Sequence, residues 1–400
     1  MADLFAGTYA RGAAAAAAAS EAWLAAMLDV EAALARACEH EGLIPSGAAD
    51  RILAACDPTG FDLVELAREG GEHASVVVPL VRALRIRVGE PIAGYVHLGA
   101  TSQDIVDTAA MLVARRALEP LVGDVSATAA IAAELADRHR STAIAGRTLL
   151  QQALPTSFGL RAAGWMVALD RARARLLDVR VRVLAVQMGG PVGSRPPVIA
   201  RLVAAELGLA EPVLPWHTDR TREAELAGGL GTLAGALAKL GRDVTLLAQD
   251  EIGELREGGG GDPGEGGREG GGRGLSSAMA HKRNPVAAVS ILACTRRVPG
   301  LVATILASME QEHERAAGAW QAEWGTLREL LVLTGSAAAW GRDLLHHLQV
   351  DPVRMRENLG RLAAAGVSAA QEPELAVANE LIDRALTAHE QLGGVRENHG

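Results

Sequence analysis

A run of leucines between residues 223 and 256 places the strongest constraint on how this chain can fold. Apolar residues alternate at spacings of four and three, at Leu226, Leu230, Leu233, Leu237, Leu240, Val244 and Leu247. Such heptad spacing is typical of a helix that packs nearly parallel to another helix along its length. A helix of about 30 residues is roughly 45 Å long, so the segment predicts a rod that spans the molecule.

Four further segments have the length and apolar content of long helices. They are residues 103–140, where Pro120 marks a kink or a break, and residues 158–188, 286–309 and 327–348. Five long helices with a continuous apolar seam predict an all-α fold built on an elongated bundle.

Shorter helical segments precede and follow the bundle, the first of them capped by Ser20. We therefore expect a helical N-terminal domain (1–96), a central bundle with polar loops (97–348) and a short helical C-terminal domain (349–400). The first boundary lies just beyond the helix-breaking sequence Gly89-Glu90-Pro91.

Composition narrows the class of protein. Aromatic residues make up only 3% of the chain, which favours helices because strands use aromatic and β-branched residues. The net charge of −9 argues against a general nucleic-acid-binding protein, although a small anion needs only local positive charge. Three scattered cysteines indicate buried thiols in a reducing compartment. No run of about 18 strongly apolar residues is present, so we expect a cytoplasmic protein without membrane or nucleic-acid partners.

The stretch from Gly274 to Pro285 concentrates reactive polar side chains. It reads Gly-Leu-Ser-Ser-Ala-Met-Ala-His-Lys-Arg-Asn-Pro, follows a glycine-rich segment (258–273) and leads into the helix expected at 286–309. One interpretation is a solvated basic turn. The other is a lid that closes over a substrate, since glycine hinges beside polar side chains suit such a movement.

A second polar cluster, His97-Leu-Gly-Ala-Thr-Ser-Gln-Asp104, lies at the start of the helix expected at 103–140. Thr101 or Ser102 can cap that helix, and Asp104 suits its positive end. For Asp104 we favour this structural role alone. A cap does not need the histidine, both hydroxyls and Gln103 together, however, and helix-start amides beside hydroxyls can bind a carboxylate.

Two further polar segments lie between expected helices. Residues 146–158 bring the donors Arg147, Thr148 and Gln151 to a stretch interrupted by a proline, and alone they indicate a polar loop before a helix. Residues 310–324 hold a dense group of charges and two tryptophans. A solvated connector with two core tryptophans and a functional segment explain this second stretch equally well.

The sequence offers no pattern for a metal or an organic cofactor. The glycine-rich segment lacks Gly-x-x-x-x-Gly-Lys-Ser/Thr spacing and follows no expected strand, so it does not indicate a phosphate-binding loop. His346 and His347 are adjacent and therefore point to different sides of a helix, which is poor geometry for a metal. We expect neither a metal nor a cofactor.

Three of these segments resemble the signature regions of the fumarase/aspartase superfamily. They are Ser276-Ser-Ala-Met-Ala-His-Lys-Arg-Asn-Pro285, His97-Leu-Gly-Ala-Thr-Ser-Gln-Asp104 and Gly146-Arg-Thr-Leu-Leu-Gln-Gln-Ala-Leu-Pro155. Within the superfamily, these segments and residues 310–324 are most similar to the 3-carboxy-cis,cis-muconate cycloisomerases. The resemblance implies a three-domain chain whose long helices form the core of a homotetramer, with active sites shared between subunits and no cofactor.

The resemblance also implies a reaction and roles for residues. The reaction is the lactonisation of 3-carboxy-cis,cis-muconate in protocatechuate degradation (the beta-ketoadipate pathway), by addition of a substrate carboxylate and protonation of the α-carbon. Lys282 and Asn284 are expected at the carboxylate on which charge develops. Ser276 is the first candidate for proton transfer and His97 the second. The remaining polar residues of the signature regions are expected to bind this small polycarboxylate, namely Thr101, Ser102, Gln103, Arg147, Thr148, Gln151 and His281.

Alternatives within and outside the superfamily stay open. Its purine and arginine-pathway lyases carry a histidine directly after the threonine of the second signature region, where this chain has Leu149. The missing base argues against an adenylosuccinate lyase. The alternatives are another superfamily lyase that eliminates a group from a succinyl-type substrate, and an inactive helical bundle with a structural role.

Overall fold

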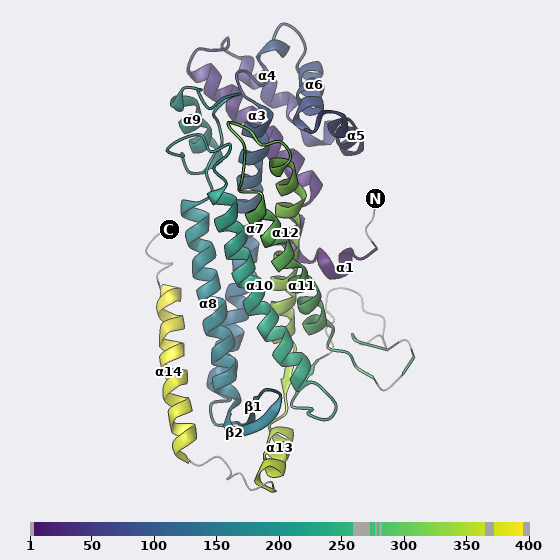
Figure 1. Cartoon of the computed structure of the whole chain (residues 1–400), viewed down its shortest axis with the longest axis vertical. Helices are drawn as coiled ribbons and strands as arrows, with labels where there is room; N and C mark the ends of the chain where they lie inside the picture. Colours follow the sequence, from purple (N-terminus) through teal and green to yellow (C-terminus); the bar gives the residue numbers. More distant parts are fainter. Residues whose placement is uncertain (1–3, 259–272, 277, 280–281, 365–371, 395–400) are drawn as a thin grey trace.

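The computed structural model describes residues 4–258, 273–276, 278–279, 282–364 and 372–394. Long helices run side by side along most of its length (Figure 1), and they confirm the predicted five-helix bundle. These helices are α7 (Ser102–Arg138), α8 (Phe158–Arg182), α10 (Thr221–Leu247), α11 (Val286–Ala307) and α12 (Ala319–His346).

The leucine seam lies on α10, and every residue of it is at most 1% exposed. The helix packs against α8, α11 and α12, as its heptad spacing requires. It ends at Leu247, the last residue of the seam, and not at residue 256 as predicted. The chain turns back there because the Gly253 amide donates to Gln249 and the Glu254 amide donates to Leu247. Strand β3 (Leu255–Glu257) then pairs antiparallel with β4 (Leu348–Val350).

Three predicted details of the helices change. Of the kink or break predicted at Pro120, the break is wrong, because helix α7 continues through this residue. Helix α12 begins at Ala319, eight residues earlier than residue 327, so the tryptophans of the 310–324 segment belong to a helix and Trp320 is buried. The prediction that Ser20 caps a helix is wrong, because Ser20 is itself the first residue of α3 (Ser20–His40) and no side chain caps that end.

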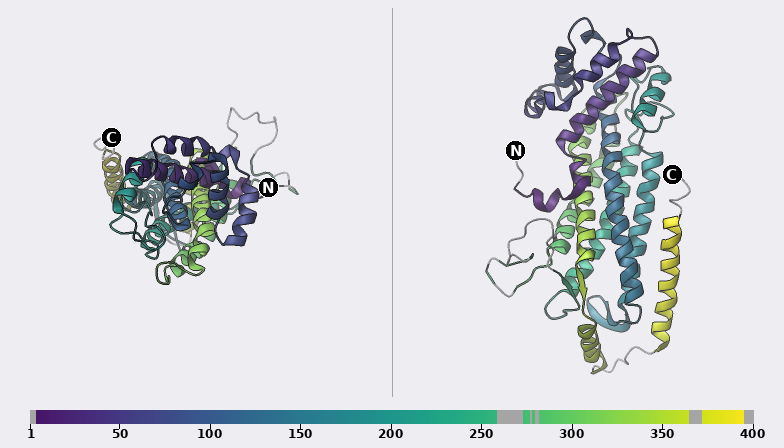
Figure 2. Two further views of the ribbon diagram at one scale, coloured as in Figure 1. Left: turned by 90° about the horizontal axis from the view of Figure 1, so that it is seen from above. Right: turned by 180° about the vertical axis from the view of Figure 1, so that it is seen from behind.

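Shorter helices cover the two ends of the bundle. At one end lie α3, α4 (Ala48–Ala55), α5 (Leu63–His73), α6 (Val77–Val88) and α9 (Pro197–Leu207), seen from above and behind in Figure 2. Short helical turns complete these parts of the chain. Helices α1 (Ala6–Tyr9) and α2 (Gly12–Ala16) pack against the bundle, η1 (Pro58–Gly60) lies between α4 and α5, and η2 (Ala93–Tyr95) lies between α6 and α7.

The C-terminal helices lie toward the other end of the bundle. Helix α13 (Pro352–Ala364) sits beside the strands at that end, and α14 (Glu372–Gly394) runs along α8. His389 of α14 places its Nδ1 atom 2.7 Å from a carboxylate oxygen of the buried Asp170 on α8. The division into domains at residues 96 and 348 stays a prediction.

A β-hairpin occupies the segment that we expected to be a polar loop before a helix. Strand β1 (Ala143–Thr148) pairs antiparallel with β2 (Gln151–Ser157), with an irregular register between Ala145 and Arg147. Only Leu149 and Leu150 form the turn, and both have positive φ angles, 50° and 65°. The usual Asn-Gly signal for such a turn is absent, which is why the sequence did not indicate it.

Helix α11 is the most apolar of the long helices. By length and mean hydropathy it is the one described helix that could cross a membrane, and 39% of its most apolar window is buried in the chain. In the structure it packs against α10 and α12. Val289 and Leu306, on its remaining surface, are each about half exposed. The bundle therefore leaves part of an apolar helix uncovered.

Candidate active site

The first signature region lies at the end of the bundle where α7 begins. His97 precedes the helix with a φ angle of 63°, a conformation that costs free energy for a residue with a Cβ atom. Its Nδ1 atom lies 2.6 Å from Oε1 of Glu31 on α3. The Glu31 side chain is fully buried. A buried carboxylate therefore fixes the orientation of the imidazole, a contact that no sequence motif indicated.

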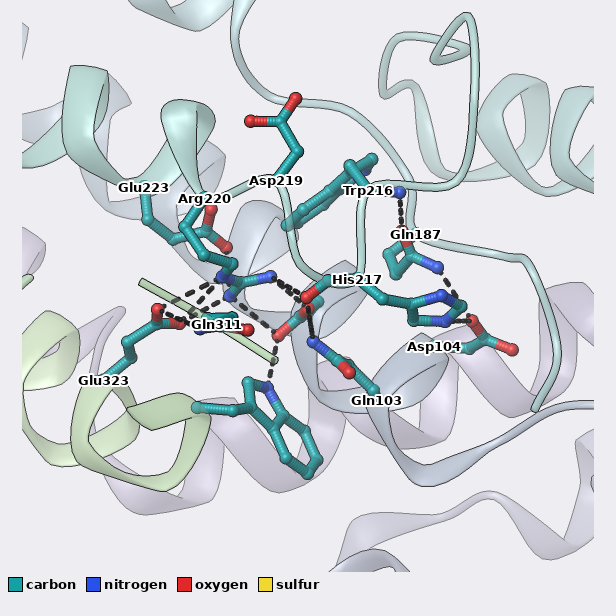
Figure 3. A network of polar contacts seen from close by, with 12 residues as sticks. Gln103, Asp104, Gln187, Trp216, His217, Asp219, Arg220, Glu223, Gln311 and Glu323 are labelled. Atoms are coloured by element: carbon teal, nitrogen blue, oxygen red, sulfur yellow. Dashed lines mark hydrogen bonds and ion pairs between the residues drawn. The ribbon is translucent and has the colours of Figure 1, made fainter. Parts of the chain in front are cut away.

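Thr101 and Asp104 form a capping box at the start of α7, as predicted for the threonine. Asp104 also holds the surrounding loops in place, because its buried carboxylate accepts hydrogen bonds at 2.8–3.1 Å from the Thr101, Gly189 and Gly190 amides. The same carboxylate accepts from Gln187 Nε2 at 3.0 Å and lies 3.0 Å from His217 Nε2 (Figure 3). This confirms its structural role. Ser102, the first residue of α7, is half-buried beside it.

Gln103 turns into the protein and not toward solvent. Its side chain is fully buried, and its Nε2 atom donates to Asp107 at 3.0 Å and to the His217 carbonyl at 2.7 Å. Its Oε1 atom accepts from Arg315 at 3.3 Å. Both amide hydrogens are thus used within the chain. The hydrogen bond from Arg315 to Gln103 places the 310–324 segment against the first signature region.

A buried cluster of charges lies behind Gln103. The guanidinium of Arg220, 2% exposed, contacts three carboxylates: Asp107 at 2.7 Å, Glu223 at 2.6 Å and Glu323 at 2.5 Å (Figure 3). Trp320 Nε1 donates to Asp107, and Gln311 Nε2 donates to Glu323. The cluster joins α7, the start of α10 and α12 at one point, and it was not predicted.

Burial gives this cluster unusual protonation. Desolvation raises the pKa of Glu223 to about 8 and that of Glu323 to about 7, while Arg220 acts in the opposite direction on both. The physical reason is that one guanidinium cannot neutralise three carboxylates in a medium that water does not reach. Burial in the cluster therefore favours the protonated form of Glu223 and Glu323 more than water does.

The second signature region forms the β1–β2 hairpin at the opposite end of the bundle. Arg147 makes a bidentate pair with the fully buried Glu254, at 2.8 and 2.7 Å. Its guanidinium is therefore engaged by the protein. Thr148 and Gln151 are paired in the sheet and exposed. They flank the turn of Leu149 and Leu150, which are 96% and 76% exposed.

The third signature region leads into α11. Ser276 is half-buried, and its Oγ atom accepts from the amides of Ala278 at 3.3 Å and Met279 at 3.1 Å. Lys282 is exposed and, with Asn284, lines a cavity of about 1030 Å³. The Asn284 Nδ2 atom donates to the Gly274 carbonyl at 3.2 Å. His281 and most of the expected glycine-rich lid lie outside the described residues.

One chain does not bring these regions together. Helix α7 has 37 residues and is therefore about 55 Å long, with the first signature region before it and the hairpin after its far end. The hairpin and the third region are both at that far end. Arg147 of the hairpin pairs with Glu254, and Glu257, three residues later at the end of β3, accepts from the first turn of α11, which follows the third region. Among the described residues, no group of three histidine, cysteine or acidic side chains could hold a metal ion.

Residues 9–300 match the sequence profile of a protein family described as lyase. The chain belongs to the fumarase/aspartase superfamily of lyases. The all-α expectation is confirmed, with short strands added at one end of the bundle.

Superfamily members with assigned activities are similar over most of the chain. A 3-carboxy-cis,cis-muconate cycloisomerase of Pseudomonas aeruginosa is 46% identical over 343 residues, 84% of this chain and 72% of that protein. A nitrosuccinate lyase of Streptomyces davaonensis is 43% identical over 387 residues, 91% of this chain and 79% of that protein. The crystal structure of the 3-carboxy-cis,cis-muconate lactonizing enzyme of Pseudomonas putida superposes with a TM-score of 0.86 at 33% identity, covering 98% of this chain and 99% of that one.

Proposed function

We propose that the chain is a cycloisomerase that converts 3-carboxy-cis,cis-muconate to carboxymuconolactone in protocatechuate degradation. The observation that carries the proposal is the similarity to named cycloisomerases over nearly the whole chain, 46% in sequence to one and a TM-score of 0.86 to another. The signature residues Ser276, Lys282 and Asn284 are all present. A bacterial catabolic enzyme of this kind would act in the cytoplasm.

The reaction requires no covalent bond between the protein and the substrate. One substrate carboxylate oxygen forms a bond to a carbon of the conjugated double bond, and the π electrons move toward the neighbouring carboxylate. A proton then adds to the α-carbon and completes the lactone. Nucleophile and acceptor belong to one molecule, so the enzyme must fold the substrate, stabilise the developing charge and deliver the proton.

We assign these tasks to the signature regions. Lys282 is a cation on the third region that can stabilise the enediolate-like carboxylate, together with Asn284. Ser276 is the first candidate for proton transfer and His97, oriented by Glu31, is the second. The half-buried Thr101 and Ser102 and the exposed Thr148 and Gln151 remain the candidates for the other carboxylates, with His281.

For two residues that were expected to bind the substrate, Gln103 and Arg147, we propose a positioning role instead. Gln103 has both amide hydrogens bonded within the chain, so we place it behind the site as a support for Arg315. Arg147 is held by Glu254 in a bidentate pair, so we place it at the base of the hairpin whose Thr148 and Gln151 point outward.

We infer that the active sites are shared between copies in a homotetramer. About 55 Å of α7 separates the first region from the hairpin, a distance that no small polycarboxylate spans. The partly uncovered apolar surface of α11 and the exposed leucines of the hairpin turn offer contacts for other copies. A bundle core that continues across subunits would cover the first, since exposed apolar patches mark interfaces.

A second candidate is an elimination on a substituted succinate. It is favoured by the 43% identity to the nitrosuccinate lyase of Streptomyces davaonensis. Both reactions place charge on the carboxylate next to the carbon that exchanges a proton, so the same Lys282 and Ser276 would serve either one.

One assay separates the candidates. Purified protein is mixed with 3-carboxy-cis,cis-muconate, and the ultraviolet absorbance of the conjugated diene is followed. Loss of the absorbance supports the cycloisomerase; its persistence, together with release of nitrite from nitrosuccinate, supports the lyase. Ser276→Ala and His97→Ala are then compared with the parent protein, and the role in proton transfer fails if each variant keeps full turnover.

A further inference from the structure

The third signature region is closed at its base like a small hairpin. The Asn284 amide donates to the Gly274 carbonyl at 2.8 Å, and Leu275 and Arg283 form an antiparallel bridge. Gly274 has a φ angle of 80°, and a Cβ atom there would lie 2.3 Å from the Asn284 carbonyl oxygen. Glycine is therefore required at this neck, and the segment that carries Ser276 and Lys282 leaves the bundle from a single narrow point.

Glu257 fastens one side of that neck to the bundle. It ends β3, and its carboxylate accepts from the amides of Ala287 at 3.0 Å and Ala288 at 2.9 Å. These amides belong to the first turn of α11, where backbone donors have no partner within the helix. The position of the first turn of α11, and with it of Asn284 just before, is thus set by a remote carboxylate.

Arg273 fastens the other side. Its Nη1 atom donates to Asp343 on α12 at 2.5 Å, and its Nη2 atom lies 3.7 Å from the Glu257 carboxylate. Its guanidinium lies over the Trp340 ring, with 5.0 Å from Cζ to the ring centroid, and Arg11 contacts the same ring at 4.0 Å. We call Glu257, Arg273 and Asp343 the anchor. The Arg273 side chain is 14% exposed, and Asp343 and Glu257 less.

We propose that Arg273 is a positioning residue for the reaction, a role that rests on the proposed function. Through the anchor, Arg273 fixes the position of the third signature region, with Ser276 and Lys282, relative to α12. Only Gly274 and Leu275 separate Arg273 from the reactive serine, so a shift of the guanidinium moves the serine almost directly. Displacements of about 1 Å at reacting groups cost about a hundredfold in rate, whereas substrate binding by the other two signature regions is left intact.

The first test is kinetic. Arg273→Ala is expected to lower kcat by about tenfold or more while KM changes by less than about threefold. Arg273→Lys, which keeps the charge but cannot reach two carboxylates and stack at once, is expected to recover part of the loss. Asp343→Asn should resemble Arg273→Ala, and the double variant should be no slower than the slower single one. Arg342→Ala, which removes the neighbouring exposed arginine and its contact with Asp124, should keep the parent kcat. A parent-like kcat in Arg273→Ala overturns the proposal.

The second test does not depend on turnover. Hydrogen exchange is measured by mass spectrometry on peptides that cover residues 282–290. The amides of Asn284, Ala287 and Ala288 are bonded in the structure, and faster exchange of these amides is expected in Arg273→Ala but not in Arg342→Ala. Unchanged exchange overturns the proposal, as does faster exchange with parent-like kcat. If the parent protein leaves carboxymuconate untouched, the proposed function fails, and the exchange still decides whether Arg273 anchors the hairpin.

Discussion

The Nδ1 atom of His97 lies 2.6 Å from Oε1 of Glu31, a carboxylate that the fold buries completely. The pair joins the loop before α7 to α3 and makes Nδ1 the ring nitrogen that carries hydrogen. Nε2 is then the atom that can take up or release a proton. Replacing Glu31 by glutamine removes the charge that holds this tautomer, and we expect kcat to fall by about tenfold.

The matched control for that prediction is Glu21→Gln, on the exposed first turn of the same helix. It should leave kcat unchanged. Thermal unfolding of both variants is measured alongside turnover. If Glu31→Gln keeps the parent kcat, proton transfer does not depend on the orientation that Glu31 gives to His97.

The Arg147–Glu254 pair allows two roles of the arginine to be separated. Glu254 is buried and also accepts from Asn358 at 2.8 Å, so Arg147→Ala leaves a buried charge with one partner fewer. We expect the free energy of unfolding to fall by about 3 kcal/mol or more, seen as a lower melting temperature by calorimetry. A higher KM with an unchanged melting temperature would instead assign Arg147 to direct substrate binding.

The buried cluster around Arg220 predicts a dependence of stability on pH. Burial raises the pKa of Glu223 from its ordinary 4.5 to about 8, so the folded state favours the protonated acid. Its stabilising contribution is full below about pH 4.5 and is lost as the pH rises through 8. In Glu223→Gln the side chain stays neutral, and the melting temperature at pH 8.5 should exceed that of the parent by about 3 °C or more.

At pH 4 the same variant and the parent should melt within about 1 °C of each other, because Glu223 is then protonated in both the folded and the unfolded parent. Glu225→Gln, on the exposed face of the same helix and paired loosely with Arg175, should show no pH-dependent difference. If the melting temperatures of Glu223→Gln and the parent differ by the same amount at both pH values, the raised pKa of Glu223 is contradicted.

The hairpin turn predicts a conflict between local stability and assembly. Leu149 and Leu150 occupy positive φ angles, which cost about 1 kcal/mol each for residues with a Cβ atom. Replacing them by Asn-Gly suits such a turn, so the melting temperature of the dissociated chain should not fall. Because the exposed leucines are proposed to contact another copy, light scattering should show weaker assembly, and turnover should fall. If the variant keeps the molecular mass in solution and the turnover of the parent, the turn lies outside the interface.

Periodicity predicted the long helices well because a helix that packs along its whole length repeats its apolar residues regularly. The α10 seam is buried from Leu226 to Leu247, and the helix ends where the seam ends. Residues 249–256 continued to look helical, because no single residue there reveals that β3 pairs with β4 almost a hundred residues later. Pairing between distant segments is invisible to local patterns.

The candidate site was predictable only as far as motifs reach. The signature residues were found by their order and spacing, whereas the partners that orient them come from elsewhere: Glu31 from α3 for His97, and Glu254 from beyond α10 for Arg147. The Arg220 cluster draws on three helices, and none of its members has a distinctive neighbourhood in the sequence. Burial of Gln103 likewise follows from what packs around it.

The anchor holds together side chains at the two ends of the glycine-rich segment, because Nη2 of Arg273 lies 3.7 Å from the carboxylate of Glu257, just before the segment. Residues inserted between two points that are held together need not change the distance between those points. We therefore expect an insertion between Glu257 and Arg273 to be tolerated. A fluorescent reporter or a protease recognition sequence spliced there would leave the serine-bearing hairpin where Arg273 holds it.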